Sequence, residues 1–515
     1  MLKRAVSLER GAGNEGNRSV AVRPRLLVGL EVSETNTHRY DLVVIGGGTA
    51  GLTAAVFAAR LGAKVAVIEQ DRVGGGCTWT ACVPTKTMVN TAKVAFQANH
   101  ADRYGLPRAD LDAEWSSIMA HVHSVVEQIH RGESPEILRS EGIDLFTGEA
   151  RFIDSRTVAA GDDRFSSPRI LIATGSRPKT LPSPDNADRL PNVVTYRTLW
   201  SLESLPTRLV VVGGGPQGCE MAQAFARLGS QVTLISGSDR LLPRDEPEVS
   251  ALLTDILKEE GVVVELGAEA TEVVRDDDGT KVVTAEGRYP ADVILAATGR
   301  SPEVEGLQLD KANVRVGPAG IQVNDHLLTS QAGIFAAGDC IGGYQFTHLA
   351  AWHGFVATRN ALLPGNMRVN KISVPWVTFT DPEIAHVGMT EEEARARYGR
   401  QVKTALKPMA EVDRARTEVA TDGFIKLVYS TGGRLRGVTV ASAQGGESIQ
   451  GWGLALDHGL KLGDVARTLN AYPTYSLANM ELAADLEMER LQSGASGKVV
   501  KWVSAALLRF RTGGR

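Results

Sequence analysis

Asp41-Leu42-Val43-Val44-Ile45-Gly46-Gly47-Gly48-Thr49-Ala50-Gly51 is the first strongly patterned segment of this 515-residue chain. Its apolar half is typical of a buried parallel strand, and its second half has Gly-x-Gly-x-x-Gly spacing through Gly46, Gly48 and Gly51. A helical segment follows, and then a second apolar run that ends in Glu69. Together these features predict a dinucleotide-binding unit, with the glycines at the pyrophosphate and Glu69 at the ribose hydroxyls.

The same pattern returns in the second half of the chain. The apolar run Arg208-Leu209-Val210-Val211-Val212 leads into a second fingerprint, formed by Gly213, Gly215 and Gly218, and then into another helix and strand. Two complete copies predict two separate Rossmann-type units, and therefore an α/β fold.

The second copy differs from the first at the position that selects the nucleotide. Ser236 stands where the first copy has Glu69. A carboxylate there would repel a 2′-phosphate, whereas a serine would not. Arg240 and Arg244 follow closely enough to pair with such a phosphate. We therefore expect NADPH at the second unit, with NADH as the alternative.

Short turns of small residues end three further apolar runs. Thr174-Gly175 ends one of them, and Thr298-Gly299 ends its counterpart after the second fingerprint. The third run ends in Gly338-Asp339. A single carboxylate at the end of an apolar run can lie beside a bound polyol, so we interpret Asp339 as a ligand contact.

Two of the four cysteines lie close together in Gly74-Gly75-Gly76-Cys77-Thr78-Trp79-Thr80-Ala81-Cys82-Val83-Pro84-Thr85-Lys86. A zinc site would need a second Cys or His pair, which the isolated Cys219 and Cys340 do not supply. A structural disulfide that closes so short a loop would remove little chain entropy. The glycines and Pro84 can distort the helical turn enough to allow a bridge, and a strained bridge is easily reduced. We therefore interpret Cys77 and Cys82 as a redox-active pair and expect no structural metal.

Composition narrows the function classes. A net charge of −4 gives no basic footprint for nucleic acid, and 43% hydrophobic with 23% charged residues is typical of a globular protein. Four cysteines suit a reducing compartment, so we expect a cytoplasmic protein.

Residues 1–38 predict a disordered extension, with an organelle transit peptide as the alternative. The basic amphipathic tail 491–515 could rest on an anionic membrane surface or pack on a dimer partner.

The motifs, in this order, resemble the FAD-dependent pyridine nucleotide–disulfide oxidoreductases of class I, over about residues 39–490. The resemblance implies FAD at the first unit and NAD(P)H at the second. It implies that Lys86 lies at the isoalloxazine and pairs with Glu220, and that Asp339 contacts the ribityl chain. It also implies that Cys82 lies against the flavin as a thiolate, while Cys77 faces the substrate.

The resemblance also implies two Rossmann-like domains followed by a C-terminal α+β dimerisation domain, and therefore a homodimer. The predicted boundaries are 1–38 for the extension, 39–185 with 320–368 for the FAD-binding domain, 186–319 for the NAD(P)-binding domain, 369–490 for the dimerisation domain and 491–515 for the tail. Within the first domain, residues 87–145 predict helices, with Val94 and Ile129 among the expected core positions.

One motif departs from the family pattern. Disulfide reductases end in His-Pro-Thr-x-x-Glu, whose His moves a proton and whose Glu orients the His. Here Tyr472 and Leu477 occupy those two positions. Mercuric reductase-like members are similar to this chain in carrying Tyr, and Gln345-Phe346-Thr347-His348 also resembles them. However, no cysteine follows Cys340, and residues 1–38 contain none, so the metal-handling cysteines of mercuric reductase are absent from the sequence.

Three functions therefore stay open. The first, which the missing His favours, is an NADPH-dependent reductase of a soft metal ion or thiol-reactive electrophile, with Cys77, Cys82, Lys86, Glu220 and Tyr472 as its catalytic residues. The second is a dihydrolipoamide dehydrogenase-like or other disulfide or quinone reductase that uses another acid. The third is a flavoprotein that senses redox state with little turnover.

Overall fold

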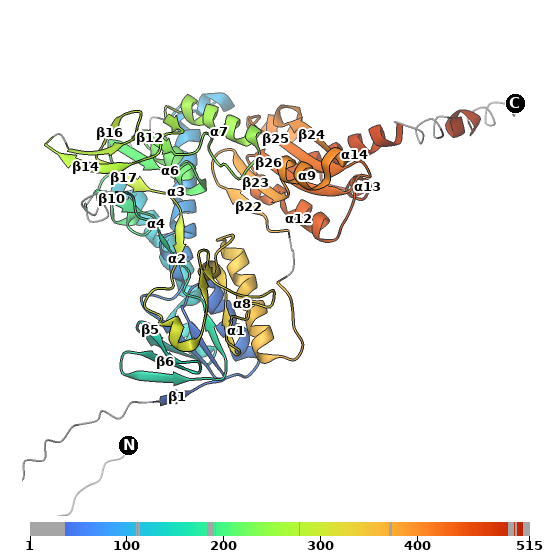
Figure 1. Ribbon diagram of the computed structural model, residues 1–515. Helices are drawn as coiled ribbons and strands as arrows, with labels where there is room; N and C mark the ends of the chain where they lie inside the picture. The colour runs from blue at the N-terminus through green and yellow to red at the C-terminus, as the bar shows by residue number, and fades with distance from the viewer. Residues whose placement is uncertain are drawn as a thin grey trace, which may run out of the picture.

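The computed structural model describes residues 37–109, 111, 114–182, 190, 192–277, 279–369, 373–492, 499 and 502–507. Figure 1 shows three lobes: a first lobe at the bottom, a second at the upper left and a third at the upper right. The first and second lobes each contain a parallel sheet and the third an antiparallel one. The predicted fold class, two Rossmann-like units plus an α+β domain, is confirmed.

The first lobe is built on a parallel five-stranded sheet in the order β21-β8-β2-β3-β4. Its strands are β2 (Leu42–Ile45), β3 (Val65–Glu69), β4 (Ile143–Thr147), β8 (Ile170–Ile172) and β21 (Ile334–Ala336). Helices α1 (Thr49–Arg60) and α8 (Thr347–Leu362) pack closely, because Gly354 meets Ala50 with no room for a side chain: a Cβ there would lie 2.2 Å from the Ala50 carbonyl oxygen. This contact fixes the N-terminus of α8 relative to the first fingerprint.

A smaller sheet flanks the first lobe, in the order β1-β7-β6-β5. Its strands are β1 (Thr37–Arg39), β5 (Ala150–Asp154), β6 (Thr157–Ala160) and β7 (Asp163–Ser166). Two short antiparallel ladders complete this part of the chain: β9 (Ser176–Pro178) with β18 (Arg300–Pro302), and β19 (Val316–Gly317) with β20 (Gly320–Ile321).

The second lobe repeats the parallel architecture in the order β10-β17-β11-β12-β13. Its strands are β10 (Val193–Thr195), β11 (Arg208–Val212), β12 (Gln231–Ser236), β13 (Val263–Leu266) and β17 (Val293–Ala296), with helices α6 (Pro216–Arg227) and α7 (Pro247–Glu259). An antiparallel sheet, β14 (Glu272–Asp276), β15 (Gly279–Val283) and β16 (Arg288–Ala291), adjoins it.

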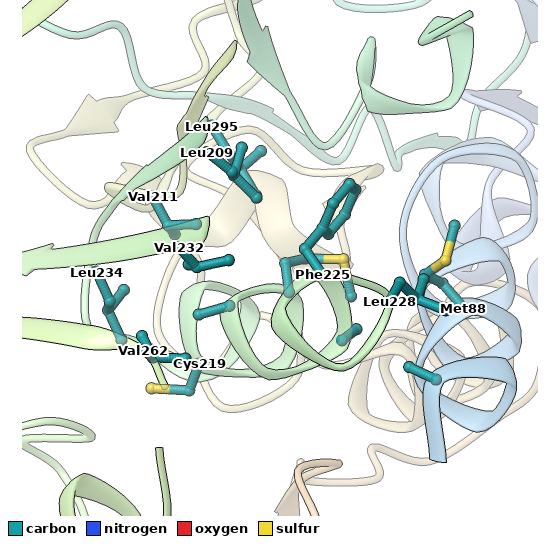
Figure 2. Close-up of a cluster of buried hydrophobic side chains, with 14 of the residues drawn as sticks. Met88, Leu209, Val211, Cys219, Phe225, Leu228, Val232, Leu234, Val262 and Leu295 are labelled. Atoms are coloured by element: carbon teal, nitrogen blue, oxygen red, sulfur yellow. The ribbon is translucent and has the colours of Figure 1, made fainter. Parts of the chain in front are cut away.

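The core of the second lobe extends into the first. Figure 2 shows Leu209, Val232 and Leu295 of the sheet facing Phe225 of α6, and Met88 approaching from the neighbouring helix α3 (Cys82–Asn99). All five side chains are less than a tenth exposed. Helix α3, which begins at a predicted redox cysteine, is therefore held by apolar packing against the second nucleotide unit.

The third lobe contains an antiparallel sheet in the order β22-β23-β26-β25-β24. Its strands are β22 (Trp376–Thr378), β23 (Glu383–Gly388), β24 (Val402–Pro408), β25 (Phe424–Ser430) and β26 (Leu435–Ser442). Its helices are α9 (Glu391–Tyr398), α10 (Asp413–Thr417), α11 (Gly445–Ser448), α12 (Gln450–Asp457), α13 (Leu462–Val465) and α14 (Tyr475–Gln492). Within the described residues, no helix is long and apolar enough to cross a bilayer.

The helical prediction for residues 87–145 needs two corrections. The segment contains most of α3, then α4 (Trp115–His130) and α5 (Pro135–Ser140), but it ends in strand β4. Val94 and Ile129, expected in the core, are exposed by 55% and 45%. Val94 lies about 200° around the helix from the buried Ala92, and Ile129 lies in the last turn of α4.

Candidate active site

The two predicted redox cysteines lie at a break between two helices. Cys77 is in the short helix α2 (Gly75–Trp79), and Cys82 begins α3. Ala81 between them has φ −118° and ψ −96°, outside the helical region, so the backbone turns sharply there. Both cysteines are unbridged, and their thiols are hydrogen-bonded to each other. The distorted turn expected from the sequence is therefore present.

The glycines before Cys77 hold α2 against the first fingerprint. Gly75 has φ +61°, and a Cβ there would lie only 2.7 Å from the Cα atom of Gly48. Glycine tolerates both the left-handed backbone and this close approach. The fingerprint loop and the cysteine helix consequently line the same hollow.

The negative charge of the reduced pair resides on Cys82. The hydrogen bond from Cys77 lowers the pKa of Cys82 to about 6, because the donated bond stabilises the thiolate. The positive charges of Lys86 and Arg300 act in the same direction, and burial acts against them. The same hydrogen bond raises the pKa of Cys77, with burial adding to the effect.

The Lys86–Glu220 pair expected from the resemblance is present. The Nζ atom of Lys86 lies 2.7 Å from Oε2 of Glu220, whose side chain is 3% exposed. The other carboxylate oxygen of Glu220 accepts the backbone N–H of Phe379, and the Lys86 ammonium lies over the Phe379 ring. The Lys86–Glu220 ion pair thus connects three parts of the chain. It joins α3 to α6 of the second lobe, and Glu220 joins both to Phe379, which directly follows β22 of the third lobe.

A hollow of about 320 Å³ brings together residues from distant parts of the chain. Its lining includes Gly46, Gly48, Glu69, Cys77, Cys82, Thr174, Gly175, Arg300, Gly338, Asp339 and Thr347. Two predicted flavin contacts, Gly51 and Lys86, do not line it. Gly51 instead packs the helix on the strand, because a Cβ there would lie 1.9 Å from the Gly46 carbonyl oxygen.

The polar groups of this hollow fit a dinucleotide such as FAD. Glu69 accepts the N–H groups of Gly47 and Asp71 at 2.6 and 2.9 Å, which orients its carboxylate at the end of β3. Asp339 receives the Ser176 hydroxyl at 2.7 Å and an Arg300 N–H at 3.2 Å, both on Oδ2. The Nε atom of Arg300 is buried without a hydrogen-bond partner among the described residues. A bound ligand with polar groups would satisfy it.

The second fingerprint repeats the geometry of the first. A Cβ on Gly218 would lie 1.8 Å from the Gly213 carbonyl oxygen, so this glycine also serves close packing of helix on strand. Gly215 has no neighbour within 4 Å of such a Cβ, which leaves space above the turn for a ligand. Gly299, at φ +108°, turns the chain from β17 into β18.

Ser236, the residue proposed to admit the 2′-phosphate of NADPH, does not share a pocket with Arg240 and Arg244. Ser236 is 3% exposed, and its hydroxyl accepts the N–H of Ser238 at 3.3 Å. Arg240 donates to the Pro243 carbonyl oxygen at 2.8 Å. Arg240 lines a second hollow together with Arg244, Asp245, Tyr344 and Trp376, and Ser236 does not line it.

Tyr472 lies on the surface of the third lobe and is 71% exposed. Its hydroxyl donates to Asp413 Oδ2 at 3.1 Å, and this bond raises the pKa of the phenol. Tyr475 donates in the same way to Glu418, at 2.8 Å. The Tyr-Pro-Thr-Tyr segment is thus fastened to the α10 region, a contact that the sequence motif did not indicate.

Sequence reasoning missed Thr347, Arg300 and Asp413. Thr347 begins α8 and contacts both cysteine sulfurs, although the sequence around it indicated only a family likeness. Arg300 follows the second Thr-Gly turn directly, where its closeness to Asp339 could not be seen without the sheet topology.

Within the described residues, no cluster of three or more His, Cys, Asp or Glu side chains could hold a metal ion.

Comparison with protein-family models identifies most of the chain. Residues 40–354 match the pyridine nucleotide-disulphide oxidoreductase model, and residues 374–483 match the model of the dimerisation domain of the same family. The second match supports a homodimer.

Two groups of relatives are similar to this chain. A mercuric reductase from Bacillus cereus is 36% identical over 453 residues, which cover 86% of this chain and 71% of that protein. A dihydrolipoyl dehydrogenase from Bacillus subtilis (strain 168) is 35% identical over 448 residues, 84% of this chain and 96% of that protein. The two identities are too close to decide between the activities.

Solved structures agree with the sequence relatives. The HOCl-induced flavoprotein disulfide reductase RclA from Escherichia coli has a TM-score of 0.78 at 27% identity, covering 86% of this chain and 99% of its own. LpdA from Mycobacterium tuberculosis has a TM-score of 0.79 at 28% identity, covering 87% and 99%. The chain therefore belongs to the pyridine nucleotide-disulphide oxidoreductases, as an FAD-dependent, NAD(P)H-using oxidoreductase with a redox-active cysteine pair.

Proposed function

We propose that the chain delivers electrons from NADPH, through FAD and the Cys77–Cys82 pair, to a soft metal ion or a thiol-reactive electrophile. The observation that carries this proposal is the state of Tyr472, which stands where disulfide reductases have a proton-shuttling His. The phenol directs its one hydroxyl proton to Asp413. That proton is consequently held by a carboxylate of the same chain.

The cysteine pair is suited to receive electrons. Bound FAD supplies a two-electron relay between the nicotinamide and the cysteines. Cys82, held as a thiolate near neutral pH, is the sulfur that would face bound FAD, as the family resemblance implies. Lys86, fixed by Glu220, supplies a positive charge that stabilises the Cys82 thiolate. Cys77, which keeps its proton until a substrate arrives, is the sulfur that attacks or binds the substrate.

A disulfide substrate would need more than this site offers. When a thiolate attacks a disulfide, the departing thiolate benefits from a nearby acid, and His, with its usual pKa of about 6.5, is suited to that task. Tyr472 has a pKa above that of a free phenol because of Asp413, so it is a weaker acid. A thiolate-bound metal ion can accept two electrons without receiving a proton.

The second candidate function, a dihydrolipoyl dehydrogenase-like disulfide reductase, is favoured by the 35% identity to the Bacillus subtilis protein. It would require water or another side chain as the acid.

NADPH is favoured over NADH because Ser236 brings no carboxylate to the 2′ position. Contact of the tail 491–515 with a membrane stays a prediction, since most of that segment lies outside the described residues.

An anaerobic titration with NADPH, followed by substrate tests, examines the proposal. Wild type should develop a long-wavelength charge-transfer band, and Cys82→Ala should not. Wild type should then consume NADPH rapidly when Hg(II) is the electron acceptor, and hardly at all when lipoamide or glutathione disulfide is the acceptor. Rapid turnover of either disulfide would reject the role given to Tyr472. Absence of turnover with every acceptor would favour a redox sensor.

A further inference from the structure

Thr347 is the one hydroxyl among the described residues whose hydrogen bonds reach both redox sulfurs. Its Oγ1 atom lies 3.2 Å from Sγ of Cys82 and 3.3 Å from Sγ of Cys77. Both distances are within hydrogen-bonding range for sulfur. The residue is the first of α8, and Gly354 locks that helix against α1, so the hydroxyl is held in place by close backbone packing.

A threonine hydroxyl has a single hydrogen to donate. When Cys82 is the thiolate and Cys77 donates to it, the Thr347 hydroxyl can donate to Cys82 as well. When Cys77 loses its proton to act on a substrate, rotation about one C–O bond turns the same hydrogen to Cys77. No heavy atom has to move, since the two distances differ by only a tenth of an ångström.

We propose that Thr347 is a positioning residue that shares one hydroxyl hydrogen between the two sulfurs and thereby stabilises the negative charge on whichever cysteine carries it. This inference deepens the proposed function and rests on the redox role of Cys77 and Cys82. A hydrogen bond to a thiolate is a strong one, whereas a disulfide sulfur accepts weakly. The contact therefore stabilises the reduced pair more than the oxidised pair.

The charged groups around the pair cannot follow the negative charge from one sulfur to the other. Lys86 and Arg300 act on Cys82, and Arg300 is itself shared with Asp339. The negative charge of Glu133 acts on Cys77, and its carboxylate accepts the Thr78 hydroxyl at 2.9 Å. These charges favour one fixed location for the negative charge. Burial lowers the pKa of the neighbouring His348, so its imidazole is neutral near pH 7.

The experiment compares Thr347→Val, which keeps the shape and loses the hydroxyl, with Thr347→Ser, which keeps the hydroxyl. Thr358→Val is the matched control: Thr358 lies in the same helix, is 1% exposed and has no hydrogen-bond partner for its hydroxyl among the described residues. Each holoprotein is reduced anaerobically with NADPH, and the charge-transfer band is recorded from about pH 5 to about pH 9, where perturbed thiols titrate.

For Thr347→Val, the pH at which the band reaches half its height should rise by about one unit, the effect of losing one hydrogen bond to a thiolate. Thr347→Ser and Thr358→Val should match wild type. An unchanged profile in Thr347→Val, or an equal shift in Thr347→Ser, would overturn the inference.

A second readout does not depend on FAD. Protein reduced with dithiothreitol is alkylated with iodoacetamide over the same pH range, and the modification of the Cys77 and Cys82 peptides is followed by mass spectrometry. Thr347→Val should move the alkylation of Cys82 to higher pH. If the variant instead shows the same alkylation profile as wild type, the inference is overturned, and this holds even if the variant has lost its flavin. If wild type alone shows no band, the route through the flavin fails, while the alkylation profile still decides the role of Thr347.

Discussion

Lys86 and Glu220 form an ion pair 2.7 Å long between the cysteine helix and the second nucleotide unit. We predict that Glu220→Gln keeps an acceptor for the Phe379 N–H but loses the charge that orients Lys86. A hydrogen bond between charged groups is worth about 1.5–3 kcal/mol, so flavin reduction by NADPH should slow by about tenfold or more. Stopped-flow bleaching of the flavin measures this rate. Glu259→Gln, on the exposed end of α7, serves as the control, and equal rates in both variants would refute the role of the pair.

Gly51 supplies a prediction about packing. A Cβ at this position would lie 1.9 Å from the Gly46 carbonyl oxygen, so Gly51→Ala must displace either the strand turn or helix α1. We expect loss of bound FAD and a lower melting temperature. Gly132→Ala is the matched control, because no atom lies within 4 Å of a Cβ there. FAD content after gel filtration tests the prediction, which fails if Gly51→Ala retains stoichiometric flavin.

Arg227 is the centre of a buried polar network that joins the second and third lobes. Its guanidinium, 4% exposed, pairs with Glu260 at 2.6 Å and with Asp381 at 3.0 Å, and it lies over the Phe96 ring. Removing one partner of a buried ion pair costs about 3–5 kcal/mol, because the other charges stay desolvated. Arg227→Ala should therefore lower the thermal midpoint clearly. Arg208→Ala, which removes the exposed Arg208–Asp292 pair, should change it little, and a similar loss in both variants would contradict this account.

The pH dependence of the reduced enzyme follows from Cys82. Because its pKa is lowered to about 6, the thiolate is present above that pH and is lost as the pH falls through it. The charge-transfer absorbance of wild type should consequently be high at neutral pH and decline with a midpoint near 6. A midpoint near the ordinary value for a cysteine, about 8.5, would show that the neighbours do not stabilise the thiolate.

The sequence was sufficient for those parts of the fold that rest on local pattern. An apolar strand, a fingerprint and a helix appear in order at Gly46 and again at Gly213, and each pattern fixes its own βαβ unit. Lys86 and Glu220 were paired only through the family resemblance, which the geometry now supports. The roles of these and the other predicted site residues stay predictions until variants are measured.

The remaining contacts could not be read from the sequence, because they join segments that only the tertiary fold brings together. Thr347 reaches Cys82 from a helix far along the chain, and it does so because Gly354 allows α8 to approach α1. Asp413 meets Tyr472 across two elements with no shared motif. Val94 was placed in the core by its apolar character alone, although it lies on the outward face of α3.

The most direct test of the central claim is NADPH consumption by wild type with Hg(II) and with glutathione disulfide, measured beside Tyr472→His. We predict turnover of wild type with Hg(II), very little with the disulfide, and a gain of about tenfold in disulfide turnover when the imidazole supplies the missing acid. Fast disulfide turnover by wild type, unchanged or slowed in Tyr472→His, would contradict the claim that this site lacks a proton donor for disulfides.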